Sequence, residues 1–254
     1  MKDAIPADRP LFEIGPKAYL YGADVVALAR AADRASEEHD VTVVFTSPIL
    51  EARAVVDSVE HILVCVPHLD PIRPGRGITD ILPEALVEAG VRMVMLNHAE
   101  HPITFTVLEK TMQRAAEVGL ATAVCASSLA EVRAVASLGP DLLVAEPTEL
   151  IGTGKPSGFD YVEASNRAVR EINPGVRVLQ GAGISTPADV EAVIRNGANA
   201  TGSSSAIPSG TVRSISISGS SPSRASTGSG TSSSAAASTA VSSTISTPSS
   251  PNRR

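Results

Sequence analysis

A glutamate followed by an apolar, glycine-containing loop is the part of the sequence best suited to chemistry. Glu146 comes directly after Leu142–Ala145, an apolar run with the composition of a buried strand. The apolar pair Leu150–Ile151 follows, and Gly152 and Gly154 supply mobile joints beside it. Such a loop can close over a ligand and exclude water. A lone glutamate would more simply be a surface residue, but the loop favours Glu146 as a proton-abstracting base.

A histidine and a lysine follow two other apolar runs in the same way. His98 comes shortly after Met93–Leu96 and is a candidate acid or electrophile, with a buried structural histidine as the alternative. Lys17 comes shortly after Leu11–Ile14, where a cation would attract an anionic substrate and stabilise negative charge developing on oxygen. A solvated surface lysine is the alternative there. His68, which follows a third run, is a weaker candidate for supporting the site from behind.

Two turns rich in small residues come late in the chain, at Gln180–Ser185 and Thr201–Ala206. Small residues let backbone N–H groups approach an anion closely, and the loops after the last two strands of α/β barrels often bind phosphate. These turns therefore indicate a phosphorylated ligand. Two nucleotide-binding patterns fail: Pro156 stands where a P-loop needs Ser or Thr, and Thr186 replaces the last glycine of a dinucleotide motif.

Short apolar runs alternate with amphipathic stretches along most of the chain. This alternation predicts an α/β protein, and at this number of units it favours a (β/α)8 barrel over an open doubly wound sheet, although the pattern alone fits both. The expected strands are Leu11–Ile14, Thr42–Phe45, Ile62–Val66, Met93–Leu96, Ala121–Cys125, Leu142–Ala145, Val176–Leu179 and, near the end, Asn199–Ser203. The expected helices are Asp24–Glu38, Pro48–Asp57, Leu82–Ala89, Ile103–Val118, Leu129–Leu138, Tyr161–Ile172 and Pro187–Arg195.

The composition changes abruptly after residue 207. We expect a barrel domain at 1–207 and a low-complexity tail at 208–254, which is roughly two-fifths serine and contains no Leu, Phe, Asp, Glu or Lys. Such a segment buries too little apolar surface to offset its ordering entropy, so we expect it to be disordered. The barrel would then lack its final helix. We hypothesise that the tail is a frameshifted reading of a region that once encoded that helix.

Composition limits the classes of function. The 254 residues suffice for one barrel, and a net charge of -6 argues against a nucleic-acid or anionic-membrane partner. Cys65 and Cys125 are too few for a disulfide framework or a metal cluster and fit buried strand thiols. Without a long apolar stretch at the N-terminus or elsewhere, we expect a soluble cytoplasmic protein.

Five segments together resemble the short, archaeal-type branch of the triosephosphate isomerase family. They are His68–Pro71, Leu82–Gly90, Leu96–Glu100, Ala145–Gly154 and Leu179–Ser185, within a similarity running from about Lys17 to Ile207. The resemblance implies a TIM barrel that interconverts dihydroxyacetone phosphate and glyceraldehyde 3-phosphate through an enediol(ate), without a metal or organic cofactor, as a homodimer or homotetramer. It also implies catalytic roles for Lys17, His98 and Glu146. The substrate phosphate would lie among Ile151, Gly152, Gly183, Ser204 and Ser205.

The chain departs from the family pattern at two further places. Gly15 stands where the family usually has an asparagine, two positions before the lysine, and the loop Arg73–Asp80 does not closely match the family's subunit-interlocking segment. By making extra room for the substrate, Gly15 leaves open an isomerase of a longer phosphorylated ketose. Together with the tail, it also leaves open a catalytically impaired relative that binds phosphorylated ligands. A phosphate-binding barrel synthase or epimerase would leave the loop after Glu146 unexplained.

Overall fold

The computed structural model describes most of the region expected to form the barrel. The residues described are 5–6, 9–150, 157–181, 183–184, 186–195, 198 and 200–203. Four of the expected phosphate-binding residues, Ile151, Gly152, Ser204 and Ser205, lie outside them, as does the serine-rich tail. The boundary expected at residue 207 and the expected lack of a final helix therefore remain predictions.

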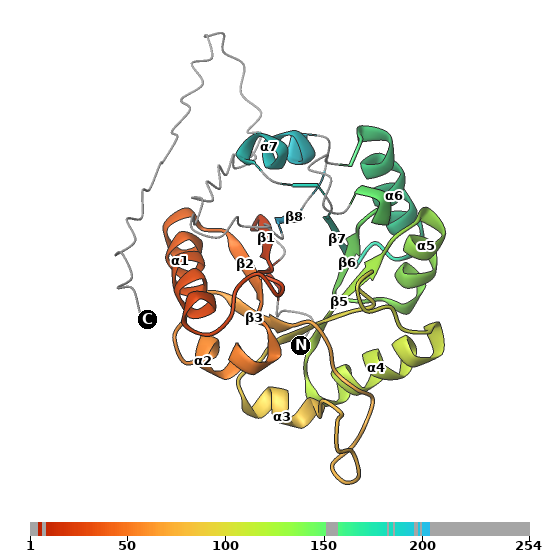
Figure 1. Cartoon of the computed structure of the whole chain (residues 1–254). Coiled ribbons are helices and arrows are strands. Elements are labelled where there is room, and N and C mark those ends of the chain that lie inside the picture. Colours follow the sequence, from red (N-terminus) through yellow and green to blue (C-terminus); the bar gives the residue numbers. More distant parts are fainter. Residues whose placement is uncertain are drawn as a thin grey trace, which may run out of the picture.

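Eight parallel strands close into a barrel in which each strand pairs with its neighbours in sequence and β8 pairs with β1 (Figure 1). The strands are β1 Leu11–Ile14, β2 Thr42–Thr46, β3 Leu63–Val66, β4 Met93–Leu96, β5 Ala121–Ala126, β6 Leu142–Ala145, β7 Arg177–Gln180 and β8 Ala200–Ser203. The closed sheet confirms the (β/α)8 barrel and excludes the open doubly wound alternative.

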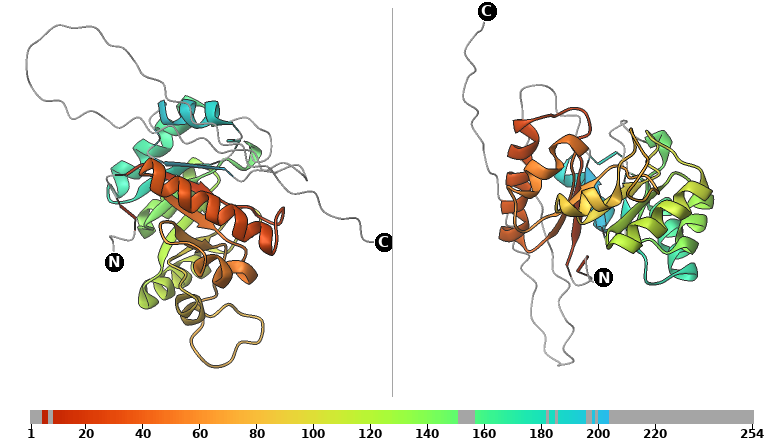
Figure 2. Two further views of the ribbon diagram at one scale, coloured as in Figure 1. Left: turned by 90° about the vertical axis from the view of Figure 1, so that its left-hand side faces the viewer. Right: turned by 90° about the horizontal axis from the view of Figure 1, so that it is seen from below.

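A helix follows each of the strands β1 to β7 in sequence, and these helices lie around the barrel (Figures 1 and 2). They are α1 Ala23–His39, the 3₁₀ turn η1 Ile49–Glu51, α2 Ala52–Val56, α3 Pro83–Glu88, α4 Phe105–Val118, α5 Leu129–Leu138, the 3₁₀ turn η2 Thr148–Leu150, α6 Phe159–Ile172 and α7 Pro187–Arg195. The helix expected over 48–57 is divided between η1 and α2, and α6 begins two residues earlier than the periodicity indicates.

Local sequence sets the ends of several helices. Thr104 and Ser128 cap α4 and α5 by accepting hydrogen bonds from the amides of Val107 and Glu131. Gly119 and Gly139 end the same two helices in the left-handed conformation that glycine adopts without strain. Capping residues and glycines that are visible in the sequence therefore set the beginning and end of α4 and α5.

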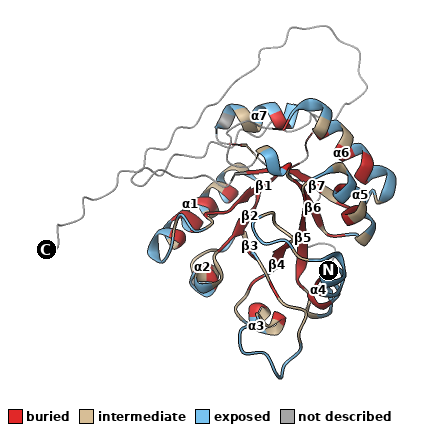
Figure 3. Cartoon of the chain, turned by 45° about the vertical axis from the view of Figure 1, so that its right-hand side comes forward, coloured by how far each residue is buried: buried red, intermediate tan, exposed pale blue. Residues whose placement is uncertain are grey.

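Side chains alternate between the interior of the barrel and the layer under the helices, because successive residues of a strand face opposite sides. On β1, Leu11 packs in the interior, whereas Phe12 and Ile14 pack beneath the helices with Val25 of α1. Figure 3 shows buried strands surrounded by helices that are buried on one side and exposed on the other. The layer under the helices is made mainly of branched aliphatic side chains, and the interior also holds Met, Cys and Ala.

The loop between β3 and α3 projects from the body of the barrel (Figure 1). Ile78 in this loop is fully exposed. Arg114 of α4 holds the base of the loop, since its guanidinium donates to the Ile72 carbonyl at 2.9 Å and to the carboxylates of Glu84 and Glu117 at 2.7 Å each. The projection is therefore anchored at its base to α3 and α4.

Candidate active site

The barrel brings Lys17, His98 and Glu146 to the same end. They follow β1, β4 and β6, and all parallel strands of a closed barrel point their carboxyl ends to one face. Each of the three side chains is mostly buried, with 20%, 16% and 12% of its surface exposed in that order. Residues that are 129 positions apart in sequence, from 17 to 146, therefore share one partly enclosed mouth.

One chain of contacts links the three candidates. The Nε2 atom of His98 lies 3.4 Å from Oε2 of Glu146. The backbone amide of Glu100 donates to Nδ1 of His98 at 3.1 Å, and the carboxylate of Glu100 accepts a hydrogen bond from Lys17 Nζ at 2.8 Å. The structure thus connects the expected base, the expected acid and the expected cation through Glu100.

The contact at Nδ1 determines the form of the imidazole. A nitrogen that accepts a hydrogen bond from a backbone amide carries no proton, so His98 is a neutral imidazole with its proton on Nε2. That proton points to the side of the ring where Glu146 lies. The arrangement can donate one proton from Nε2 and accept another at Glu146, as acid–base chemistry on adjacent atoms of a substrate requires.

Backbone strain is concentrated at these strand ends. Lys17 and Asn97 have φ angles of 49° and 58°, in a region that residues other than glycine rarely adopt. The side chain of Asn97 holds its turn from both sides, because Nδ2 donates to the Cys125 carbonyl and Oδ1 accepts from the Ile103 amide, each at 3.1 Å. The turn that carries His98 is therefore fixed by hydrogen bonds before any ligand arrives.

Glu146 is held against the next strand of the barrel. Its amide donates to the Ala126 carbonyl at 3.0 Å, and its side chain lies over Gly181, just beyond the end of β7. A Cβ atom at Gly181 would come within 3.1 Å of Cβ, 3.3 Å of Cγ and 3.4 Å of Cδ of Glu146. Gly181 therefore leaves the space in which the Glu146 side chain lies.

Comparison with known proteins agrees with this geometry. The triosephosphate isomerase family profile matches residues 15–206. The chain belongs to the triosephosphate isomerase family. Similar relatives named triosephosphate isomerase include that of Methanocaldococcus jannaschii, 38% identical over 174 residues that cover 67% of this chain and 79% of the relative. That of Sulfurisphaera tokodaii is 34% identical over 202 residues, covering 78% and 88%.

Membership of the triosephosphate isomerase family confirms the resemblance on which the site residues were predicted. The family is the standard example of a glutamate base paired with a neutral histidine, and the neutral imidazole found here follows from the Glu100 amide alone. Glu100 itself was missed by the sequence argument, although its place two residues after His98 is a visible signal. Its hydrogen bond from Lys17, aided by the charge of Lys17, lowers the pKa of its carboxyl against the opposing effect of burial.

Gly183 is the one expected phosphate-binding residue of this family site that lies among the described residues. It follows β7 with a φ angle of 70°, in the left-handed region that favours glycine. Because β7 pairs with β8, these two strands lie side by side in the barrel. The described part is compatible with the expected phosphate site.

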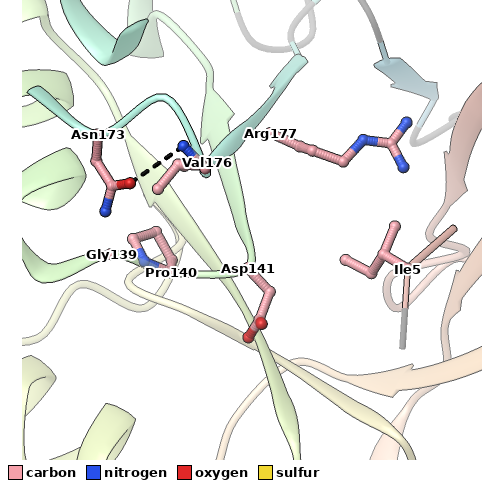
Figure 4. Close-up of a pocket in the computed structure, with 8 residues that line it drawn as sticks. Ile5, Gly139, Pro140, Asp141, Asn173, Val176 and Arg177 are labelled. Carbon is pink, nitrogen blue, oxygen red and sulfur yellow. Dashed lines mark hydrogen bonds between the residues drawn. The ribbon is translucent and has the colours of Figure 1, made fainter. Parts of the chain in front are cut away.

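A pocket of about 130 Å³ lies elsewhere, near the amino ends of β6 and β7 (Figure 4). Asp141 precedes β6 and Arg177 begins β7, so the pocket is at the opposite end of the barrel from Glu146. Arg177 also donates to the carbonyls of Pro6 and Arg9, which joins the N-terminal segment to this end. This pocket is therefore separate from the candidate active site.

The described residues also bear on metal binding, on membrane insertion and on the role expected for His68. Across that part of the chain, no group of three His, Cys, Asp or Glu side chains is arranged to hold a metal ion. None of the helices described has the length and apolar character needed to span a membrane. His68 pairs with Asp70 at 3.2 Å and its ring meets that of His101, so the partners found for it are local and are not among the three candidates.

Proposed function

We propose that this chain interconverts dihydroxyacetone phosphate and glyceraldehyde 3-phosphate by proton transfer through an enediol(ate). The observation that carries the proposal is the Glu146–His98 pair, 3.4 Å apart, with the imidazole held neutral by the Glu100 amide. Membership of the triosephosphate isomerase family supports the choice of substrate.

The geometry gives each residue a role. Glu146 removes a proton from the carbon next to the carbonyl, while His98 donates its Nε2 proton to the carbonyl oxygen, which produces an enediol. His98 then takes the proton of the neighbouring hydroxyl, and Glu146 returns its proton to the former carbonyl carbon. The substrate and product differ only in where two hydrogens lie, so atoms and charge balance without a co-reactant.

Lys17 stabilises the negative charge that develops on oxygen during these transfers. Its ion pair with Glu100 fixes the ammonium at the mouth, and the Glu100 amide fixes the imidazole. We assign Glu100 as a positioning residue that orients both groups at once. Its side chain is 60% exposed, so the contribution of the ion pair is moderated by solvent screening.

The substrate phosphate would be bound by backbone amides of the turns after β7 and β8. Gly183 lies in the first of these turns, and we retain Ile151, Gly152, Ser204 and Ser205 as further phosphate-binding residues from the family pattern. Backbone N–H groups in turns of small residues are good partners for a phosphate dianion. A Gly183→Ala variant should raise KM for the phosphorylated substrate, because alanine does not adopt this φ angle without strain.

The structure does not favour the longer-ketose alternative. That alternative rested on extra room at Gly15, but a Cβ atom at Gly15 would lie only 3.0 Å from Oε1 of Glu13. The carboxyl of Glu13 therefore occupies part of the space that a side chain at Gly15 would take. Measuring kcat/KM on three- and four-carbon ketose phosphates tests this point, and a clear preference for the longer substrate would overturn the proposed function.

We also propose that the chain works as a homo-oligomer in the cytoplasm. The projecting loop with its fully exposed Ile78 supports the first part, since a large exposed apolar side chain on an anchored loop is suited to a subunit contact. Sedimentation of the wild type and of Ile78→Asp measures it directly. A dimer or tetramer that dissociates in the variant supports this assignment, and a wild-type monomer contradicts it.

A coupled assay on the whole chain tests the proposed activity. Glyceraldehyde 3-phosphate should be converted to dihydroxyacetone phosphate by the purified protein, and the activity should be lost in a Glu146→Gln variant. Absence of turnover in a well-folded wild type, with retained binding of a phosphorylated ligand, would instead favour the catalytically impaired relative.

A further inference from the structure

A second glutamate lies on the floor of the mouth, and the isomerase mechanism does not use it. Glu13 faces the barrel interior from β1, on the same side of the strand as Leu11, and only 9% of the residue is exposed. A carboxyl group in this position is costly to bury unless the surrounding structure accommodates it.

Two glycines make room for the Glu13 side chain. Gly15 comes directly after β1, and a Cβ atom there would lie 3.0 Å from Oε1 of Glu13. Gly202 is its partner on β8, and a Cβ atom there would lie 2.9 Å from both Cβ and Oε2. Any larger residue at position 202 would collide with the glutamate, so the side chain lies in a space built for it.

The carboxyl has one polar partner and four titratable neighbours. The hydroxyl of Thr46 on β2 donates to Oε1 at 2.5 Å. Lys17 and Glu146 act on the carboxyl electrostatically, and the charge of Glu13 in turn acts on the thiols of Cys65 on β3 and Cys125 on β5. Burial raises the pKa of both thiols, which keeps them uncharged, so Lys17 and Glu146 are the charges that Glu13 meets.

Burial also favours the protonated form of Glu13 itself. Desolvation, with a smaller contribution from the charge of Glu146, raises its pKa to about 7, against the opposing effects of the Thr46 hydrogen bond and of Lys17. The group is therefore an uncharged acid in slightly acidic solution and a carboxylate in alkaline solution.

We propose that Glu13 is a further positioning residue of the isomerase, which supports the site as a neutral acid lodged between Gly15 and Gly202. Once ionised, Glu13 competes for Lys17 and places a negative charge beneath the substrate. This inference rests on the proposed function, because it concerns the charge balance of the same site. According to this proposal, ionisation of Glu13 lowers the activity of the isomerase on the alkaline side of its pH profile.

The physical reason lies in the charge that the reaction develops. The enediol(ate) and the phosphate are both anionic, so a second carboxylate below them destabilises the transition state relative to a neutral acid. A Glu13→Gln variant keeps the size of the side chain and the acceptor for Thr46 but cannot ionise. It should therefore remain active where the wild type loses activity.

The test is the pH profile of kcat/KM for glyceraldehyde 3-phosphate in wild type and Glu13→Gln. The ratio of variant to wild type should be near one at about pH 5.5 and should rise at least about threefold by about pH 8.5, with a midpoint near the pKa of Glu13. Profiles that differ by the same factor at every pH would overturn the proposal, because that result indicates a purely structural role.

Two variants make the test specific. Thr46→Val removes the hydrogen bond that lowers the pKa of Glu13, so it should move the alkaline fall in activity to higher pH. Glu163→Gln makes the same chemical change on the exposed face of α6 and should leave the wild-type profile unchanged. An alkaline limb that Thr46→Val does not move would contradict the assignment to Glu13.

Carbon-13 NMR of the side-chain carboxyls separates failure of this inference from failure of the proposed function. The resonance that disappears in Glu13→Gln should titrate near neutral pH in the wild type. An isomerase whose Glu13 titrates like an ordinary carboxyl keeps the function and loses this inference. A protein with no triose phosphate turnover loses the function, whatever the resonance does.

Discussion

Replacing Gly181 by alanine should displace Glu146, the proposed catalytic base. The new methyl group would lie 3.1 Å from Cβ, 3.3 Å from Cγ and 3.4 Å from Cδ of Glu146, which is closer than ordinary van der Waals contact for the first two atoms. The Glu146 side chain must therefore move by a few tenths of an ångström or turn about χ1. Alanine otherwise fits the backbone, because Gly181 is not among the described glycines with positive φ.

The size of the effect follows from the demands of proton transfer. A displacement approaching 1 Å in a catalytic group costs up to about a hundredfold in rate, and a shift of a few tenths about tenfold, or roughly 1.4 kcal/mol. We expect kcat to fall by about ten- to a hundredfold, while KM changes little because the variant leaves the proposed phosphate-binding residues in place. A coupled assay in both reaction directions measures both parameters.

Gly158→Ala is the matched control, since a Cβ atom at Gly158 meets nothing within 4 Å. The control should retain wild-type kcat, and both variants should unfold within a few degrees of the wild type. Equal kcat in Gly181→Ala and Gly158→Ala would refute the argument that Gly181 shapes the position of Glu146.

Three further predictions concern the rest of the site and the barrel. Glu100→Gln should lower kcat/KM by about three- to tenfold and weaken its salt dependence, because Lys17 loses a largely exposed ionic partner. Leu143→Ala should lower the free energy of unfolding by about 2–5 kcal/mol in urea titrations, since Leu143 is fully buried under the helices. Glu13, whose folded pKa is raised, stabilises the fold fully below its unfolded pKa of 4.5 and loses that contribution as pH rises through about 7. The stability of Glu13→Gln relative to wild type should therefore increase by up to about 3 kcal/mol between pH 5 and pH 8, in denaturant titrations at each pH.

The strands were predictable because buried parallel strands are short apolar runs with clear ends. Leu142–Ala145 and Met93–Leu96 match the observed strands residue for residue. β7 begins one residue later than expected and includes Gln180, because that polar side chain is buried against Ser165 and Asn166 of α6. A polar residue that finds its partner on a distant helix gives no local signal of a strand.

The three catalytic candidates were predictable from their place after strands, since a closed parallel barrel puts all such positions at one end. The groups that position them were not. Glu100 contacts Lys17, which is 83 positions away in sequence, and His98, which is two positions away. Only the fold shows that Lys17 and His98 lie in the same site. Gly181 matters because of what its missing side chain permits, which depends on the packing of β6 beside β7.

Gly15 changes meaning once the fold is known. In the sequence it is a missing amide, and it suggests additional room for substrate. In the structure the carboxyl of Glu13 reaches towards the same space, with Gly202 on the opposite side. Glu13 and Gly202 are far apart in sequence, so their pairing on β1 and β8 is visible only in the structure of the closed barrel.

The most direct test of the central claim is the kcat of Glu146→Gln, with Glu146→Asp beside it, for conversion of glyceraldehyde 3-phosphate by the whole chain. If Glu146 is the base, kcat falls by about a hundred- to ten-thousandfold in Glu146→Gln, while KM and the unfolding temperature stay close to the wild type. A Glu146→Gln variant that turns over substrate at the wild-type rate would contradict the account.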